Sequence, residues 1–208
     1  MGLGEHIAPI LTDTLGGSFE KKPFAIDGRT KLLAPAEGKV LEIGAGTGFN
    51  MPYYPVAVSA ITITDPVDGM LARARKRAAK EGKEVVATRA SAEALPFEDG
   101  SFDTVVASLV LCSVDDQDRA LTEMRRVLRP GGRYLFMEHV RSEDPGRARR
   151  QDRWEGVWKT LCFGCHPNRD TLPRIEAAFT VEDVERGEAP GGMPKLVRPY
   201  VLGRAIAG

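Results

Sequence analysis

The chain has 208 residues and carries 29 basic and 29 acidic side chains, so its formal net charge is zero. This length suits one α/β domain, and the balanced charge argues against a polyanion binder, so we expect no nucleic-acid partner. The start lacks a basic segment followed by an apolar run, and no stretch approaches the ~20 apolar residues that span a bilayer. We therefore expect neither a secretory signal nor a transmembrane segment. Three cysteines are too few for a disulfide framework and predict a reducing, cytoplasmic location.

Apolar runs alternate with charged, helix-periodic stretches along most of the chain, after a mixed leader at 1–37 that has a short apolar-periodic stretch at 7–15. Strand-like runs lie at 40–43, 57–64, 84–88, 102–111, 133–139, 179–185 and 195–206. Helical patterns lie at 68–80, with Asp68 as its N-cap, at 117–128, which stops at the Arg-Pro-Gly-Gly of 129–132, and at 144–159 and 171–178. This alternation predicts one doubly wound, mostly parallel sheet with helices on both faces and a ligand at the carboxyl ends of its strands.

The first strand runs into a glycine-rich turn with the pattern G-x-G-x-G, from Gly44 to Gly48. Glycines let a backbone turn sharply and approach a ligand closely. A dinucleotide fingerprint is spaced G-x-G-x-x-G instead, and its helix N-terminus faces a pyrophosphate. Glu42, two residues before the first glycine, would repel a pyrophosphate and suits a cationic ligand. S-adenosylmethionine carries an ammonium and a sulfonium and no phosphate; the alternative is a glycine-rich turn with a surface glutamate.

Two further signals follow at the ends of the next strands. Asp65 ends the second strand, roughly twenty residues beyond the turn, where an acid can accept hydrogen bonds from both ribose hydroxyls. Its alternative role is an acid at a helix entry. The segment 91–97 then leaves the third strand, where a backbone N–H and a polar side chain can bind an adenine edge.

Together these pieces resemble the class I methyltransferases of the ubiquinone-biosynthesis type, over residues 39–137. The matching segments, in order, are VLEIGAGTG, ITITDP, SAEALPFEDGSFDTVVASLVL and RRVLRPGG. The resemblance implies a seven-stranded Rossmann-like fold that binds S-adenosylmethionine and releases S-adenosylhomocysteine. It assigns the methionine part to Glu42, Gly44, Ala45, Gly46, Gly48 and Asn50, and the ribose to Asp65 and Pro66 with Met70 nearby. It assigns the adenine to Ser91, Ala92 and Glu93, and pocket closure to Ser108 and Leu109. Many relatives have Asp in place of Ser91, so the adenine contact could move to Glu93.

A narrower resemblance, to the membrane-anchored thiol S-methyltransferases, covers more of the chain. It is carried by KVLEIGAGTGFNMPYYP, LVLCSVDD, the segment 138–140, Gly164-Cys165 with Arg169, and LVRP near the end. Those relatives begin with a hydrophobic membrane segment that this sequence lacks. The resemblance implies methylation of a small thiol. An O-, N- or C-nucleophile such as a quinone or lipid amine, and a module that binds the cofactor without catalysis, remain alternatives.

The resemblance divides the single domain into the leader 1–37, a cofactor half at 38–140 and a substrate side at 141–208. His139, at the end of the fifth strand, is the candidate general base, because imidazole titrates near neutral pH. A histidine that caps a strand end is the alternative. By strand alternation Glu138 should point to the opposite face, so we give it no catalytic role.

The motif Cys162-Phe163-Gly164-Cys165-His166 has the spacing of covalent haem attachment, but no export signal accompanies it. Zinc would need four ligands, and no second ligand pair follows, so we expect no metal and favour a loop that borders the acceptor pocket. The helix predicted at 144–159 is basic and carries Trp154 and Trp158. It could lie on a membrane surface, but a solvated helix with its aromatic side chains packed inward is more common.

Overall fold

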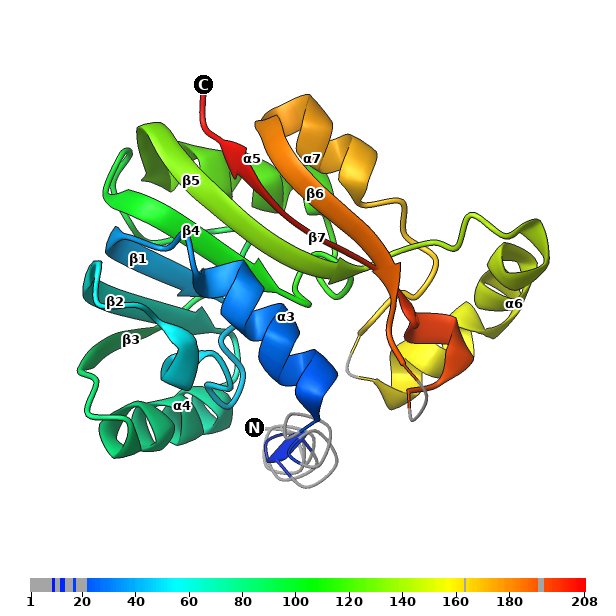
Figure 1. Cartoon of the computed structure of the whole chain (residues 1–208), viewed down its shortest axis with the longest axis horizontal. Coiled ribbons are helices and arrows are strands. Elements are labelled where there is room, and N and C mark those ends of the chain that lie inside the picture. Colours follow the sequence, from blue (N-terminus) through cyan, green and yellow to red (C-terminus); the bar gives the residue numbers. More distant parts are fainter. Residues whose placement is uncertain (1–8, 10–11, 14–16, 18–21, 163, 191–192) are drawn as a thin grey trace.

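The computed structural model describes residues 9, 12, 13, 17, 22–162, 164–190 and 193–208, and its strands form one mixed sheet (Figure 1). The strands are β1 (Gly38–Ile43), β2 (Val58–Asp65), β3 (Val85–Arg89), β4 (Phe102–Ser108), β5 (Leu128–His139), β6 (Thr180–Glu188) and β7 (Pro199–Ile206). Their order is β3-β2-β1-β4-β5-β7-β6. β1 to β5 pair in parallel, and β7 runs antiparallel to both β5 and β6, which confirms the predicted seven-stranded, mostly parallel architecture.

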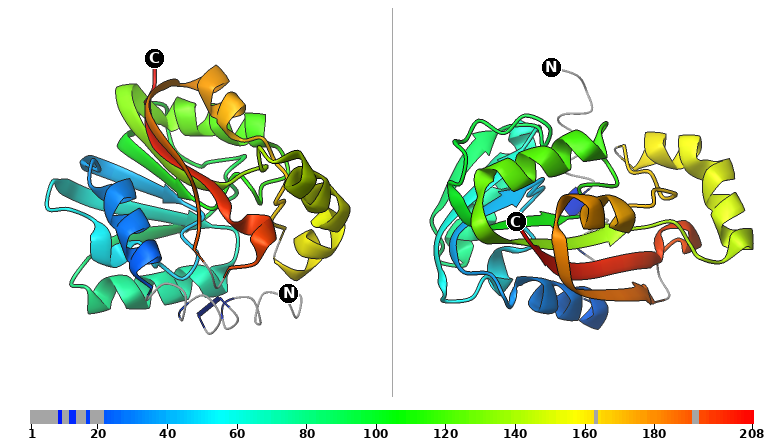
Figure 2. Two further views of the ribbon diagram at one scale, coloured as in Figure 1. Left: turned by 45° about the vertical axis from the view of Figure 1, so that its right-hand side comes forward. Right: turned by 90° about the horizontal axis from the view of Figure 1, so that it is seen from above.

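Helices cover both faces of this sheet. They are α3 (Pro23–Leu33), α4 (Asp68–Lys80), α5 (Gln117–Val127), α6 (Pro145–Leu161) and α7 (Leu172–Ala178), with short 3-10 turns η2 (Met51–Tyr53) and η3 (Lys195–Val197). Figure 2 shows α3 and α5 on opposite sides of the sheet. Along β5, Tyr134 and Phe136 pack in the core with α5 and α7, while Leu135 packs in the core with α3 and α4. This alternation is what a strand buried on both faces requires.

Several predicted boundaries were wrong. The leader contains α3, which the sequence pattern concealed because the buried face of this helix includes Arg29 and its interior includes Gly28. Val67 rather than Asp68 occupies the N-cap of α4, and Asp68 lies in the first turn. The Arg-Pro-Gly-Gly segment belongs to β5, because Leu128 already pairs with Phe102 and the register shifts just beyond.

The ends of two predicted strands also differ. The strand predicted at 102–111 ends at Ser108, since Leu109 adopts a left-handed φ of 61°. Residues 195–197 form η3, and the last strand begins only at Pro199. Of the stretch predicted at 7–15, the described residues are 9, 12 and 13, and the rest lies outside them.

Helix α6 extends past the edge of the sheet (Figure 1). Buried Gln151 ties it to the body, because its Nε2 donates to the carbonyls of Val140, Pro167 and Leu196. Trp154 is exposed, so the expectation that the aromatic side chains of this helix pack inward is wrong for that residue. Across the described ranges, we find no helix with the length and apolarity that crossing a membrane requires.

Candidate active site

A cavity of about 770 Å³ opens at the carboxyl ends of β1 to β4. This is the position where parallel α/β sheets bind ligands, since β1 lies between β2 and β4 and the strand order reverses there. The described lining residues are Thr12, Ile43, Gly44, Asp65, Pro66, Val67, Met70, Ala90, Ser91, Ala92, Glu93, Leu109, Val110, Ser113, Val114 and Asp115. They include three carboxylates and neither lysine nor arginine. The cavity therefore suits a cationic ligand without phosphate.

The glycine turn after β1 depends on positive φ angles at Gly44, Gly46 and Gly48, which are 61°, 54° and 83°. A Cβ on Gly48 would lie 2.9 Å from the Cα of Ala74 on α4, and a Cβ on Gly44 would lie 2.7 Å from a methyl of Val110. Glycine is thus required both by the backbone conformation and by the close packing of the turn. The turn is held firmly against α4 and against the segment that follows β4.

Asp65 joins the end of β2 to this turn. Its Oδ2 accepts the N–H of Gly46 at 3.0 Å, and its Oδ1 accepts the N–H of Val67 at 2.9 Å. Burial raises the pKa of Asp65, while both N–H donors favour its charged form. An ionised carboxylate offers about four lone-pair positions, so acceptor capacity remains for a ligand in the cavity that Asp65 lines.

Glu42 lies beneath the turn in a buried polar cluster. Its two carboxylate oxygens accept from Asn50 Nδ2 at 2.8 Å and from the Tyr54 hydroxyl at 2.7 Å. Arg29 of α3 donates in turn to the side-chain oxygen of Asn50. Burial raises the pKa of Glu42 to about 7, against the opposing effects of Tyr54, Asn50 and Arg29. Residues of α3 and of the segment around η2 therefore hold Glu42, the acid that the sequence predicts near the cofactor.

The far wall of the cavity is made by Ser91, Ala92 and Glu93. Ser91 Oγ accepts the N–H of Glu93 at 3.2 Å. The Oε1 of Glu93 accepts the N–H groups of Asp115 at 2.7 Å and Asp116 at 2.9 Å. Glu93 therefore fixes the segment after β4 against the segment after β3.

The strand β4 ends in strained and unsatisfied groups beside the cavity. The hydroxyl oxygen of Ser108 is buried and finds no hydrogen-bond partner within the described structure. Leu109, which lines the cavity, is the described non-glycine residue with a positive φ. Strain and orphaned polar atoms of this kind concentrate at binding sites.

A cluster of sulfur and nitrogen donors lies next to the cavity. Cys112 Sγ is 3.5 Å from the hydroxyl of Ser113, which lines the cavity, and Cys165 Sγ is 3.9 Å from Nδ1 of His139. The hydrogen bond with Cys112 and the proximity of His139 hold the pKa of the Cys165 thiol below its usual range, whereas burial opposes this. The structure thus places the predicted base beside two cysteines.

Glu138 stabilises the chain segment that carries Cys112. Its carboxylate accepts the N–H groups of Val110 and Leu111, both at 2.9 Å, and of Cys112 at 3.2 Å. Burial raises the pKa of Glu138 to about 7. A positioning role for Glu138 fits these contacts.

The three polar residues of the C-x-x-C-H motif separate in the structure. Cys162 is partly exposed, Cys165 enters the cluster, and His166 pairs through Nδ1 with Glu155 of α6 at 2.5 Å. The motif therefore does not act as one unit. Only Cys165 contributes to the wall next to the cavity.

The residues predicted for the cofactor fall into two groups. Those that line the cavity are Gly44, Asp65, Pro66, Met70, Ser91, Ala92, Glu93 and Leu109. Those that are not among its lining residues are Glu42, Ala45, Gly46, Gly48, Asn50 and Ser108. Sequence reasoning missed Arg29 and Tyr54, which support Glu42 and Asn50, and it missed Cys112, although the matching segment LVLCSVDD contains it.

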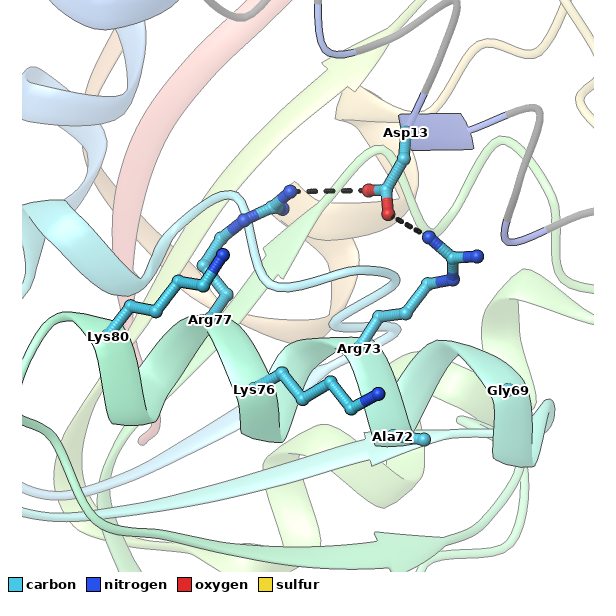
Figure 3. Close-up of a pocket in the computed structure, with 7 residues that line it drawn as sticks. All are labelled: Asp13, Gly69, Ala72, Arg73, Lys76, Arg77 and Lys80. Atoms are coloured by element: carbon cyan, nitrogen blue, oxygen red, sulfur yellow. Dashed lines mark hydrogen bonds and ion pairs between the residues drawn. The ribbon is translucent and has the colours of Figure 1, made fainter.

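A second hollow, of about 400 Å³, lies over the outer face of α4. Figure 3 shows Arg73, Lys76, Arg77 and Lys80 rising from this helix, with Asp13 bonded to Arg73 and Arg77. Arg77 also donates to the carbonyl of Thr47 in the glycine turn at 2.8 Å. This basic hollow joins the leader to α4 and to the turn, and it is separate from the cavity.

The sheet order, the acid-preceded turn, the aspartate at the end of β2 and the carboxylate-lined cavity define a class I methyltransferase that uses S-adenosylmethionine. A family model described as "Methyltransferase domain" matches residues 41–136. The chain is 36% identical to the human thiol S-methyltransferase TMT1B over 97% of its own length and 84% of that protein. It is 30% identical to the ubiquinone/menaquinone biosynthesis C-methyltransferase UbiE of Idiomarina loihiensis, over 78% of this chain and 73% of that one.

A solved structure agrees on the fold. The N-methyltransferase NodS of Bradyrhizobium japonicum, crystallised with S-adenosylhomocysteine, superposes with a TM-score of 0.73 at 16% identity, over 98% of this chain and 96% of that chain. The chain belongs to the S-adenosylmethionine-dependent methyltransferase family that includes TMT1B and UbiE.

Proposed function

We propose that this methyltransferase methylates the sulfur of a small thiol. The observation that carries the proposal is the 36% identity with human thiol S-methyltransferase TMT1B, which extends over 97% of this chain. The cluster next to the cavity supports the proposal, because it contains His139. An acceptor thiol with a pKa of ~8.5 is appreciably ionised at neutral pH, so it needs only modest help from a base to lose its proton.

In this proposal the half at 38–140 holds the cofactor. S-adenosylmethionine supplies a methyl group that its sulfonium already activates. Asp65 and Pro66 hold the ribose with Met70 beside it, and the wall at 91–93 frames the adenine. The methionine part is held by Glu42, Gly44, Ala45, Gly46, Gly48 and Asn50, and Ser108 and Leu109 close the pocket. The cavity supports this division, since all of its lining apart from Thr12 comes from residues between 43 and 115.

The acceptor side is formed by the ends of β4 and β5 and by the segment between α6 and α7. His139 is half-buried there, beside Cys165, and we propose that it assists the departure of the acceptor's proton. The chain's remaining task is to align the acceptor sulfur with the methyl and to exclude water. We also propose a cytoplasmic location, because three cysteines are too few for a disulfide framework.

The test is turnover. Purified protein with S-adenosylmethionine should release S-adenosylhomocysteine when alkyl and aryl thiols are supplied, and little when matched alcohols and amines are supplied. A reaction without protein provides the blank, and Asp65→Ala, which should bind the cofactor more weakly, should turn over more slowly at low S-adenosylmethionine. Release with a quinol while every thiol stays inert would refute the proposal and would favour the chemistry named for UbiE.

A further inference from the structure

Three metal-ligating side chains from three separate segments converge next to the cavity. Cys112 follows β4, His139 ends β5, and Cys165 lies between α6 and α7. One donor atom from each lies within 4.8 Å of the other two. The chain brings these residues together from positions far apart in sequence, so the convergence is a product of the fold.

The backbone on either side of the cluster is fixed by independent bonds. The three N–H groups bound by Glu138 hold the segment of Cys112 from one side. The N–H of His166 donates to the carbonyl of Cys112 at 2.7 Å, which ties the segment of Cys165 to it. The donor atoms are therefore held near one another without any contribution from a ligand.

We propose that Cys112, His139 and Cys165 form a zinc site. Zinc bonds of ~2.3 Å to sulfur and ~2.0 Å to nitrogen put tetrahedral donors about 3.5 to 3.8 Å apart. The distance of 3.9 Å between Cys165 Sγ and His139 Nδ1 is close to this, and the longest separation in the cluster, at most 4.8 Å, needs to close by about 1 Å. Two thiolates and one imidazole select a soft or borderline cation over magnesium or calcium.

The chemistry of the donors also fits a site that works on a substrate. Structural zinc takes four protein ligands, whereas catalytic zinc takes three and leaves one position open. The fourth position would receive the acceptor thiol: its S–H bond breaks, the proton leaves to solvent, and the thiolate sulfur bonds to zinc without any change of oxidation state. This part rests on the proposed function, and His139 then serves as a ligand while zinc favours the ionised thiol.

The test uses the full chain with its thiols reduced. Protein stripped by a chelator is titrated with Co²⁺, which reports tetrahedral thiolate ligation through visible and near-ultraviolet bands, and then with Zn²⁺ as competitor. We expect one metal ion per chain. Cys112→Ser, Cys165→Ser and His139→Asn should each weaken metal binding at least tenfold. Cys162→Ser, in the same segment but outside the cluster, should bind as the wild type does.

Binding of S-adenosylhomocysteine is measured for each variant to verify that the variant is folded. Because three ligand variants are compared, the result does not depend on any one of them folding. Absence of thiolate-to-cobalt bands, or loss of metal in Cys162→Ser with retention in Cys165→Ser, would overturn the site. A cobalt spectrum that saturating thiol leaves unchanged would overturn the fourth-ligand assignment. Thiol methylation at the full rate by metal-free protein would remove zinc from the reaction but would leave the proposed function intact.

Discussion

Replacement of Asp65 by alanine tests the cofactor site most sharply. The side chain is only 7% exposed, lines the cavity, and accepts two backbone N–H groups. Loss of hydrogen bonds between the ribose and a charged group costs about 1.5–3 kcal/mol. The dissociation constant for S-adenosylhomocysteine should therefore rise by about 10- to 150-fold in calorimetric titrations.

Two further variants make the argument specific. Asp65→Asn keeps the size but replaces one acceptor oxygen with a donor, which then opposes the N–H of either Gly46 or Val67, so it should also weaken binding. Asp68→Ala removes an exposed acid three residues away that pairs with Arg89, and it should bind normally. Equal dissociation constants for wild type, Asp65→Ala and Asp68→Ala would refute the assignment of Asp65 to the ribose.

Three other substitutions have defined outcomes. Gly46→Val should retain the fold, because a Cβ there meets no atom within 4 Å, although a φ of 54° costs a valine about 1–2 kcal/mol. The variant should lose S-adenosylhomocysteine binding in calorimetry. Normal binding would mean that the glycine turn does not contact the cofactor. The pKa of Glu42 is about 7 in the folded protein, above its ordinary value of 4.5. Between pH 4.5 and 7 the folded state therefore binds more protons than the unfolded state. The free energy of unfolding should fall as the pH rises through this range. Glu42→Gln should flatten this slope by at most about 1.4 kcal/mol per pH unit in urea denaturation, and an unchanged slope would contradict the assignment. Arg126→Ala removes the hydrogen-bond donors to the carbonyls of Leu95 and Phe97, so the thermal midpoint of the variant should drop. The surface variant Arg125→Ala should have a midpoint near that of the wild type. Equal midpoints for the two variants would show that these hydrogen bonds do not stabilise the protein.

Much of the fold could be predicted from the sequence, because apolar runs that alternate with helical patterns fit few folds other than a parallel sheet covered by helices on both faces. The elements that escaped prediction depend on tertiary contacts. Arg29 makes α3 look unlike a packing helix, and the sequence does not reveal that its guanidinium donates to Asn50 and lies over the ring of Phe49. The pairing of Leu128 with Phe102 likewise extends β5 through a segment whose Pro and Gly residues suggest a turn.

The meeting of residues at the cavity was predictable for a different reason: they follow strand ends in a fixed order, so position along the chain gives position in space. The acceptor side lacks this property. Cys112 and Cys165 are more than fifty residues apart in the sequence, and they meet only because the segment between α6 and α7 folds back over the end of β4. Local spacing drew attention to Cys162 and His166 together with Cys165, but Cys162 is outside the cluster and His166 pairs with Glu155.

A crystal structure with S-adenosylhomocysteine tests the central claim most directly. We expect the nucleoside in the cavity at the ends of β1 to β4, with its ribose hydroxyls on Asp65, its adenine against 91–93 and its sulfur on the side of the cysteine and histidine cluster. Density for the nucleoside at any other place, or a cavity that accepts NAD with its pyrophosphate on the glycine turn, would contradict this claim.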